Sequence, residues 1–392
     1  MHLQKAEMAL TISLLILSSS LFGQSEPSAF WSLKIHRNHI LNSENPFFNG
    51  RNSNLRDVTK FHGFQGEMGW QTRRLNAVNQ KLKYPAFGLG VSSFHFSETN
   101  ELGSPFTLYS FINAPFIRGS RFSLKYLLRL GLSLNWKPEH PILNPYNTVI
   151  GSHNNLFIGS GLSFEYSLLS HLVLSSELSY SHLSNSHRST PNIGLNFIKA
   201  TFGVIYHIDN YEGSFKKLDF PIEDYTDRNE FYFAFGFGSR EYTFSHYELD
   251  RKAPYVSKKY RIYNLSMGIQ RQIGYLLKLG GGLDIANNGL INARVVQEPD
   301  GSWIKVKTPA KEKLQVGIFG SLEWVIHDLS IIVQSGYKVI DQEYIRKQTR
   351  FYQHLGIKYH VDNLILGMGV RSVKFSESEY LEVNVGYRLV WF

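Results

Sequence analysis

Apolar and polar residues alternate along most of this 392-residue chain. The run from 231 to 238 is typical, with phenylalanine at every odd position and tyrosine, alanine or glycine at every even one. Successive side chains of a β-strand point to opposite faces, so a period of two predicts strands. The alternating segments are about 10 to 14 residues long, enough to cross a bilayer obliquely. One face of each is aromatic and apolar, as lipid requires, and barrel closure leaves no unpaired edge. We therefore expect an all-β fold, an antiparallel transmembrane β-barrel; a soluble β-sandwich has shorter strands and a less aromatic outer face.

The number of alternating segments indicates the size of the barrel. We count about sixteen strands, within two, and expect one barrel of that size or, alternatively, an eight-stranded barrel followed by a second β module. With a periplasmic N-terminus, turns after even-numbered strands are mostly tight, as at 168–171 and 327–329, whereas those after odd-numbered strands include the long 137–155 and 288–311. Short periplasmic turns and long external loops are typical of outer-membrane barrels. The expected strands begin near residues 30, 61, 85, 105, 122, 157, 171, 194, 229, 258, 275, 313, 329, 348, 363 and 380.

The two ends of the sequence predict export and membrane assembly. An apolar run from Met8 to Leu17 is followed by small residues near Gly23, so residues 1–23 are expected to be a cleavable signal peptide. The last segment alternates up to Phe392 and resembles the recognition signal of bacterial outer-membrane proteins. We expect a protein of the cell outer membrane. Its expected parts after the signal peptide are barrel strands at 24–208, a charged connection at 209–228 and further barrel strands at 229–392.

Composition restricts the chemistry that the chain can perform. The absence of cysteine excludes disulfides, a thiol nucleophile and a cysteine-ligated metal. The net charge of +9 is spread along the chain, without the basic block that marks a nucleic-acid surface. Histidines such as His36, His39 and His153 do not have the spacing of metal ligands. We therefore expect no nucleic-acid partner, no metal and no cofactor.

One stretch combines side chains suited to nucleophilic chemistry. His182, Ser184 and Asn185 stand at the end of one alternating segment, and Asn192 and Asn196 follow in and after a short loop. Counting by twos places His182, Ser184 and Asn196 on the lipid-facing side, near the external ends of two neighbouring strands. An imidazole, a hydroxyl and an amide in that position can meet an acyl ester of the outer leaflet. Polar side chains near the interface cost only about 0 to 1 kcal/mol, so tolerated polarity is the alternative interpretation.

The run His182-Leu-Ser-Asn, followed by Pro191-Asn-Ile-Gly-Leu-Asn196, resembles the motif of the PagL family of outer-membrane lipid A deacylases, also called acyloxyacyl hydrolases. The family is an eight-stranded barrel. The resemblance is clear over residues 85–208, and on this basis residues 229–392 lie outside it. The family pattern has an acidic residue where this chain has Asn196.

The resemblance implies that the chain hydrolyses an ester-linked acyl chain of lipid A, with Ser184 as the nucleophile and His182 as the general base. It also implies that Asn185 and a nearby backbone N–H stabilise the oxyanion, that Asn192 shapes the loop, and that Asn196 orients the imidazole. The implied partner is the lipopolysaccharide of the leaflet in which the barrel is embedded.

A non-enzymatic barrel is the alternative from another functional class, either a porin or a scaffold with a degenerate deacylase site. Sixteen strands can enclose an aqueous lumen. Inward-facing Arg, Lys and Glu would favour a pore if that lumen were open, whereas an outward-facing Ser–His contact would favour the enzyme. The sequence leaves open which acyl position is cleaved, whether the lumen is plugged, and the oligomeric state.

Overall fold

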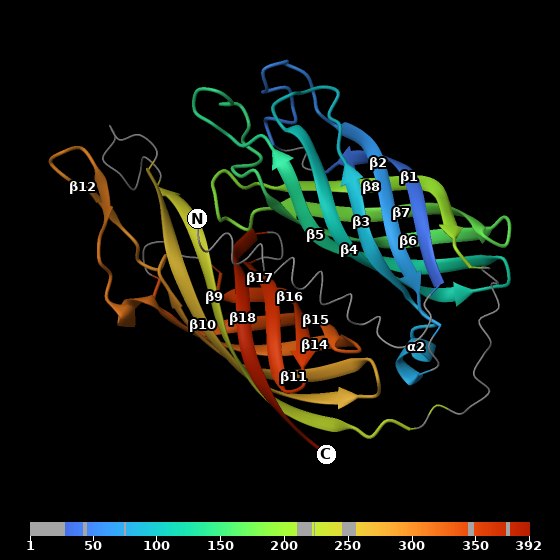
Figure 1. The fold of residues 1–392 in the computed structure, drawn as a ribbon. Helices are drawn as coiled ribbons and strands as arrows, with labels where there is room; N and C mark the ends of the chain where they lie inside the picture. Colours follow the sequence, from blue (N-terminus) through green and yellow to red (C-terminus); the bar gives the residue numbers. More distant parts are fainter. Residues whose placement is uncertain are drawn as a thin grey trace. The chain divides into compact units, whose positions relative to one another are not determined.

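The structure is a computed structural model that describes residues 28–41, 45–73, 76–209, 222, 224–244, 256–343, 349–373 and 377–392. The predicted signal peptide lies outside these residues. Sixteen long strands are present within these residues, which confirms the predicted number, and each begins within three residues of its predicted start. They form two closed barrels of eight strands, so the second of the two predicted arrangements is the one that the chain adopts (Figure 1).

The first barrel is an antiparallel meander in which each strand pairs with the next along the chain. The last strand pairs with the first, with Phe30 opposite His207, and this closes the wall. A short helix, α2 (Ala77–Lys81), lies in the connection between the second and third strands. No helix in the described ranges is long and apolar enough to span a membrane. The strands are β1 (Ser28–Ile40), β2 (Lys60–Gln71), β3 (Ala86–Ser93), β4 (Gly103–Arg118), β5 (Phe122–Trp136), β6 (Asn155–Ser167), β7 (Leu172–Ser184) and β8 (Leu195–His207).

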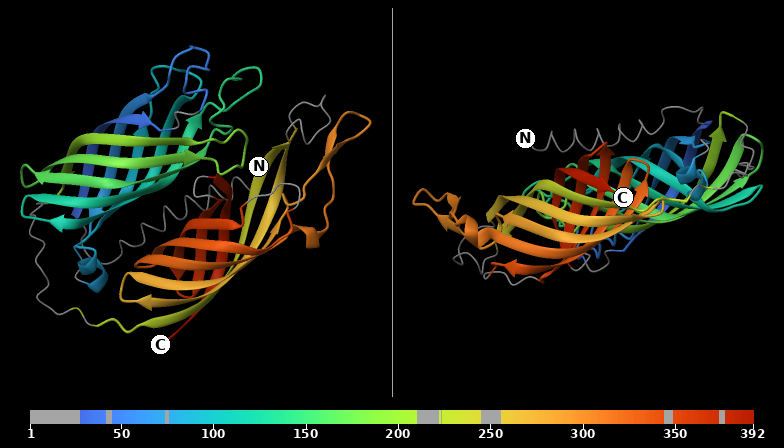
Figure 2. Two further views of the ribbon diagram at one scale, coloured as in Figure 1. Left: turned by 180° about the vertical axis from the view of Figure 1, so that it is seen from behind. Right: turned by 90° about the horizontal axis from the view of Figure 1, so that it is seen from below.

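The second barrel repeats this architecture, and its last strand pairs with its first, with Val383 opposite Phe237. Its strands are β9 (Arg228–Phe244), β10 (Val256–Ile273), β11 (Leu277–Asn288), β14 (Leu314–Ile326), β15 (Leu329–Asp341), β16 (Phe351–Val361), β17 (Leu364–Val373) and β18 (Glu377–Trp391). The predicted loop between β11 and β14 contains a small hairpin, β12 (Val295–Gln297) and β13 (Trp303–Lys305), and a 3-10 turn, η1 (Ala310–Lys313). Figure 2 shows the two walls from other directions.

Side chains sort by strand parity into an apolar exterior and a polar interior. On β7, Leu178 is 59% exposed and Ser179 is 3% exposed; on β9 the corresponding values are 52% for Phe235 and 6% for Ala234. An apolar surface on the outside of a closed wall is the arrangement that lipid requires. Both barrels are therefore of the outer-membrane type. Each barrel has its long loops at one end, the loop end, as at 137–154 and 289–313. Its tight turns are at the opposite end, the turn end, as at 168–171 and 327–328.

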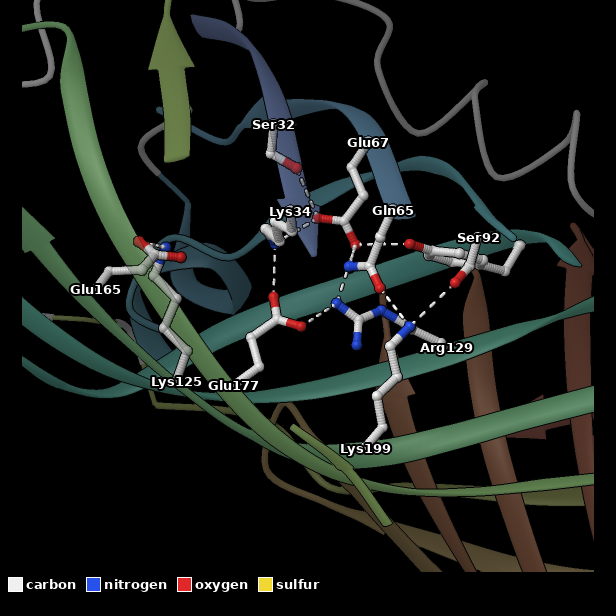
Figure 3. A network of polar contacts seen from close by, with 11 residues as sticks. Ser32, Lys34, Gln65, Glu67, Ser92, Lys125, Arg129, Glu165, Glu177 and Lys199 are labelled. Carbon is white, nitrogen blue, oxygen red and sulfur yellow. Dashed lines mark hydrogen bonds and ion pairs between the residues drawn. The ribbon is translucent and has the colours of Figure 1, made fainter. Parts of the chain in front are cut away.

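Charged side chains fill the interior of the first barrel. Lys34 Nζ lies 2.6 Å from carboxylate oxygens of both Glu67 and Glu177, and an Arg129 amino group lies 2.9 and 2.8 Å from the same two carboxylates (Figure 3). All four side chains are at most 1% exposed. An eight-stranded barrel is just wide enough for side chains to fill it. The inward charges thus pair with each other across the interior and do not line an open lumen.

The second barrel has a comparable interior. Glu323 accepts from Lys358 Nζ at 2.9 Å and lies 3.4 Å from Lys278 Nζ, and Arg371 lies 3.0 Å from Asp284. Because sixteen strands close as two narrow barrels, the wide aqueous lumen on which the porin alternative depended does not form.

Candidate functional site

The neighbouring strands β7 and β8 bring the predicted site residues to the loop end of the first barrel. His182 on β7 stands directly opposite Asn196 on β8. Cross-strand partners project on the same side of a sheet, and for this pair it is the side of the exposed Leu178. The lipid-facing direction predicted for these two residues agrees with the burial pattern of both strands.

A hydrogen bond joins the imidazole to the amide. His182 Nδ1 lies 2.6 Å from Asn196 Oδ1. An amide oxygen can only accept, so Nδ1 carries the proton and Nε2 of the neutral ring keeps its lone pair. The same oxygen accepts a second hydrogen bond from Tyr180 Oη, at 2.8 Å. The side chain of Asn196 is thus held from two positions on β7.

Ser184 lies two residues beyond His182, at the end of β7, and is only 5% exposed. Gly194 adopts φ +74°, in the left-handed region. A Cβ on Gly194 would stand 3.3 Å from both His182 Cε1 and Ser184 Cβ, and 2.7 Å from the Leu183 carbonyl oxygen. The imidazole of His182 and the side chain of Ser184 therefore border one point that only a glycine leaves free. Within the described ranges, no hydrogen bond joins the Ser184 hydroxyl to the His182 ring.

The two remaining predicted residues hold the loop between β7 and β8. The Asn185 backbone N–H donates to Asn192 Oδ1 at 2.9 Å, and Asn185 Nδ2 donates to Ser152 Oγ at 3.0 Å. Backbone bonds from Ile193 and Gly194 to the Val149 carbonyl oxygen attach the same loop to the β5–β6 loop. The Asn192 side chain thus accepts a hydrogen bond from the backbone at the start of the loop. The side chain of Asn185 is 3% exposed and donates to Ser152.

Sequence reasoning missed two residues of this network, Tyr180 and Ser152. Tyr180 could have been found, because it is two positions before His182 and shares its face. Ser152 is in a different loop, and no sequence signal brings it to Asn185. Among the residues that the structure describes, no group of three His, Asp or Glu side chains is arranged to hold a metal ion.

The fold and this cluster define a class: an outer-membrane β-barrel with an imidazole, a hydroxyl and two amides grouped at the loop end of its lipid-facing wall. Residues 229–391 match the family model described as acyloxyacyl hydrolase, C-terminal domain. The second barrel is therefore the part of the chain that is similar to the acyloxyacyl hydrolase family. The expectation that residues 229–392 lie outside the resemblance was wrong. It relied on a single motif in the first barrel, and the second barrel has no corresponding motif by which a sequence reading could assign it.

Solved structures of outer-membrane proteins are similar over most of the chain. The Pseudomonas putida toluene transporter TodX is 11% identical, with 94% of this chain and 89% of that chain covered and a TM-score of 0.17. A mutant of the Rhodopseudomonas blastica porin is 9% identical, with 92% and 99% covered and a TM-score of 0.16. Scores this low support no functional argument. Among curated proteins, no match to the chain was found.

Proposed function

We propose that this protein is an outer-membrane esterase that removes an ester-linked acyl chain from lipid A. The observation that supports this most directly is the hydrogen bond between His182 and Asn196, on the lipid-facing wall and next to Ser184. A base held by an amide and placed beside a hydroxyl is the arrangement that nucleophilic acyl transfer uses. The match of the second barrel to an acyloxyacyl hydrolase domain supports the same class of reaction.

In the proposed mechanism, Ser184 Oγ attacks the ester carbonyl carbon while its proton passes to His182 Nε2. The tetrahedral intermediate collapses, the C–O bond to the glycolipid breaks, and the imidazolium returns the proton to the departing alkoxide. Water then attacks the acyl-serine ester while its proton passes to His182 Nε2. The new tetrahedral intermediate collapses, the fatty acid leaves, and the imidazolium returns the proton to Ser184 Oγ. A rotation of the Ser184 side chain toward Nε2 must precede the attack, since catalytic hydrogen bonds often form only with substrate bound.

Asn196 takes the place of the family's acidic residue in this mechanism. Its carbonyl oxygen accepts from Nδ1, which selects the tautomer with an unprotonated Nε2. A neutral amide stabilises the imidazolium less than a carboxylate does, because charge-assisted hydrogen bonds are about twice as strong. We infer that Tyr180 compensates in part by fixing the direction of the amide.

For the oxyanion, the backbone N–H of Asn185 is engaged with Asn192. The side-chain amide of Asn185 has two hydrogens, of which one is directed at Ser152. We propose that the side-chain amide of Asn185, next to Ser184 in the chain, helps to stabilise the oxyanion, as the resemblance implies.

A porin receives less support than an enzyme. Its passage would have to cross interiors in which Lys34, Glu67, Arg129 and Glu177 form four ion pairs. Opening such a passage would separate buried charges, which costs several kcal/mol for each ion. A scaffold with a degenerate site predicts intact folding and no change in lipid A, which the following experiment detects.

The test is mass spectrometry of lipid A from outer membranes that contain the wild-type protein, Ser184→Ala, or no protein. The wild type should remove one acyl chain, and Ser184→Ala and His182→Ala should each reduce removal by several orders of magnitude, since members of such a triad act as a unit. Ser176→Ala is the matched control, because Ser176 is an exposed serine on the same strand and face. Unmodified lipid A with the wild type would refute the proposed function. Full activity of Ser184→Ala would refute the mechanism.

A further inference from the structure

Basic side chains gather at the loop end of the second barrel. β10 pairs with β11 only as far as Ile262 but with β9 as far as Val256, so the β9–β10 hairpin extends beyond the closed wall. Lys258 and Arg261 lie on this extension. Lys305 on β13 and Lys313 at the end of η1 belong to the loop between β11 and β14; Lys305 contacts the Lys259 carbonyl oxygen, and the charges of Lys258, Arg261 and Lys313 act on it. The basic cluster is defined as these four residues.

The loop that contributes two of the cations is packed in a fixed position. Trp303 and Val295 of its hairpin lie against an apolar cluster that includes Phe244 and Tyr260, on the extended part of β9 and β10. Lys305 Nζ stands 4.8 Å from the centre of the Tyr260 ring and donates to the Lys259 carbonyl oxygen. The ammonium group is therefore placed among the cations of β10 before any ligand arrives.

The basic cluster consists of four positively charged side chains. Within the described parts of the chain, no ion pair joins any of the four to a carboxylate. Acidic residues on the same elements include Glu241, which is opposite Lys259 in register, and Glu312, which precedes Lys313 in η1. Partial burial, together with the charges of Lys258, Arg261 and Lys313, lowers the pKa of Lys305. Like charges held together repel each other, and an anion bound among them would remove that cost.

The register of β10 sets the depth of the cluster relative to lipid. The outward positions from Ile269 to Tyr263 are apolar, and Tyr263 pairs with Phe237 on β9. The next outward position is Arg261, paired with Ser239. Arg261 is thus the first charged residue above the apolar band, about 7 Å along the strand from Tyr263 at 3.3 Å per residue. Head groups with their phosphates occupy this layer of a bilayer.

We propose that the basic cluster binds the phosphate groups of a phosphorylated glycolipid in the leaflet at the loop end. The proposal rests on the outer-membrane location and not on hydrolysis. It gives the second barrel a task that the site on β7 and β8 does not perform: holding the lipid whose acyl chains are the proposed substrate. Arg261 lies on the lipid-facing side of β10, and the hairpin holds Lys305 against Tyr260 and the Lys259 carbonyl oxygen, next to Arg261 in the chain.

The test is a binding titration of the full chain in neutral phosphatidylcholine nanodiscs with fluorescent bisphosphorylated lipid A. The double variant Arg261→Gln/Lys305→Gln is compared with Lys307→Gln/Lys311→Gln, which removes the same charge from exposed lysines of the same loop. Each basic residue at a membrane surface changes affinity about fivefold, so the cluster variant should bind about 25-fold more weakly than the wild type. The control variant should change affinity by less than about threefold, because its lysines lie outside the cluster. Folding of each variant is checked by its heat-dependent gel mobility.

Two further ligands identify the source of the phosphate. Dephosphorylated lipid A should bind the wild type and the cluster variant equally weakly. Inorganic phosphate at millimolar concentration should displace little lipid A. Equal affinity of the cluster variant and the wild type for lipid A would overturn the proposal, as would tight binding of the dephosphorylated lipid. Complete displacement by inorganic phosphate, or tighter binding of a DNA oligonucleotide, would also overturn it, because either result identifies a general anion surface. Repeating the titration with Ser184→Ala separates binding from turnover, so a failure here is distinct from a failure of the esterase assay.

Discussion

Replacing Tyr180 by phenylalanine removes one hydroxyl and tests whether the site depends on an amide held from two sides. The lost contact is the 2.8 Å hydrogen bond to Asn196 Oδ1, while the 2.6 Å bond from His182 Nδ1 remains possible. A neutral hydrogen bond contributes about 0.5 to 1.5 kcal/mol net. If that energy positions the base in the transition state, kcat should fall about 2- to 13-fold at constant KM.

A double-mutant cycle with Asn196→Ala assigns the effect. Once the amide is absent, Tyr180→Phe should cost almost nothing, because the hydroxyl acts only through Asn196. The assay is the initial rate of fatty acid release from lipid A in mixed micelles. Tyr166→Phe is the control, since Tyr166 is another outward tyrosine, 38% exposed, on the adjacent β6. Equal losses from Tyr180→Phe with and without the amide, or an equal loss from Tyr166→Phe, would refute the positioning role.

Three further changes examine the loop end of the first barrel. Asn196→Glu should raise the rate of deacylation if the amide is a weaker substitute for a carboxylate, and Asn196→Ala should lower it by at least about tenfold; unchanged rates in both variants would show that Asn196 takes no part. Gly194→Ala should lower the free energy of unfolding by about 1 to 2 kcal/mol, because φ at this residue is +74°, and it should also lower the rate of deacylation, because the new Cβ crowds His182. Urea unfolding measures the first effect and the same rate assay the second. A variant as stable and as active as the wild type would contradict the geometry described for Gly194. Single cysteines at His153 and at Leu168 should label from outside intact cells only at position 153, whereas labelling at 168 reverses the orientation of the barrel.

The strands were predictable because their determinant is local. A period of two appears wherever one face meets lipid and the other does not, as in the run from 231 to 238. The division into two barrels was not predictable in the same way, since it depends on β8 pairing with β1 and β18 pairing with β9. Such closures join segments more than a hundred residues apart. The hairpin of β12 and β13 is three residues per strand, too short to show a period.

The site was predictable in its direction but not in its contacts. Parity alone places His182 and Asn196 on one face, and the register makes them partners. Parity places Ser184 on the same face as His182, but it does not predict that Ser184 is only 5% exposed. The role of Gly194 depends on its backbone conformation and on two side chains across the hairpin. The contact from Ser152 depends on the fold of a loop with no alternation to read.

The interior of the first barrel has a consequence for kinetics. Because ion pairs fill the space inside and the cluster of His182 and Asn196 faces outward, a lipid reaches it only by diffusing sideways within the leaflet. Encounters then occur in two dimensions, and the variable that governs the rate is the mole fraction of the lipid in the membrane. Diluting lipid A with inert phospholipid at a fixed total amount should slow turnover, whereas diluting the whole suspension with buffer should not. In the proposed reaction, a fatty acid released from lipid A would stay in the same plane as the protein, so we expect product to accumulate at the site until it is extracted from the bilayer.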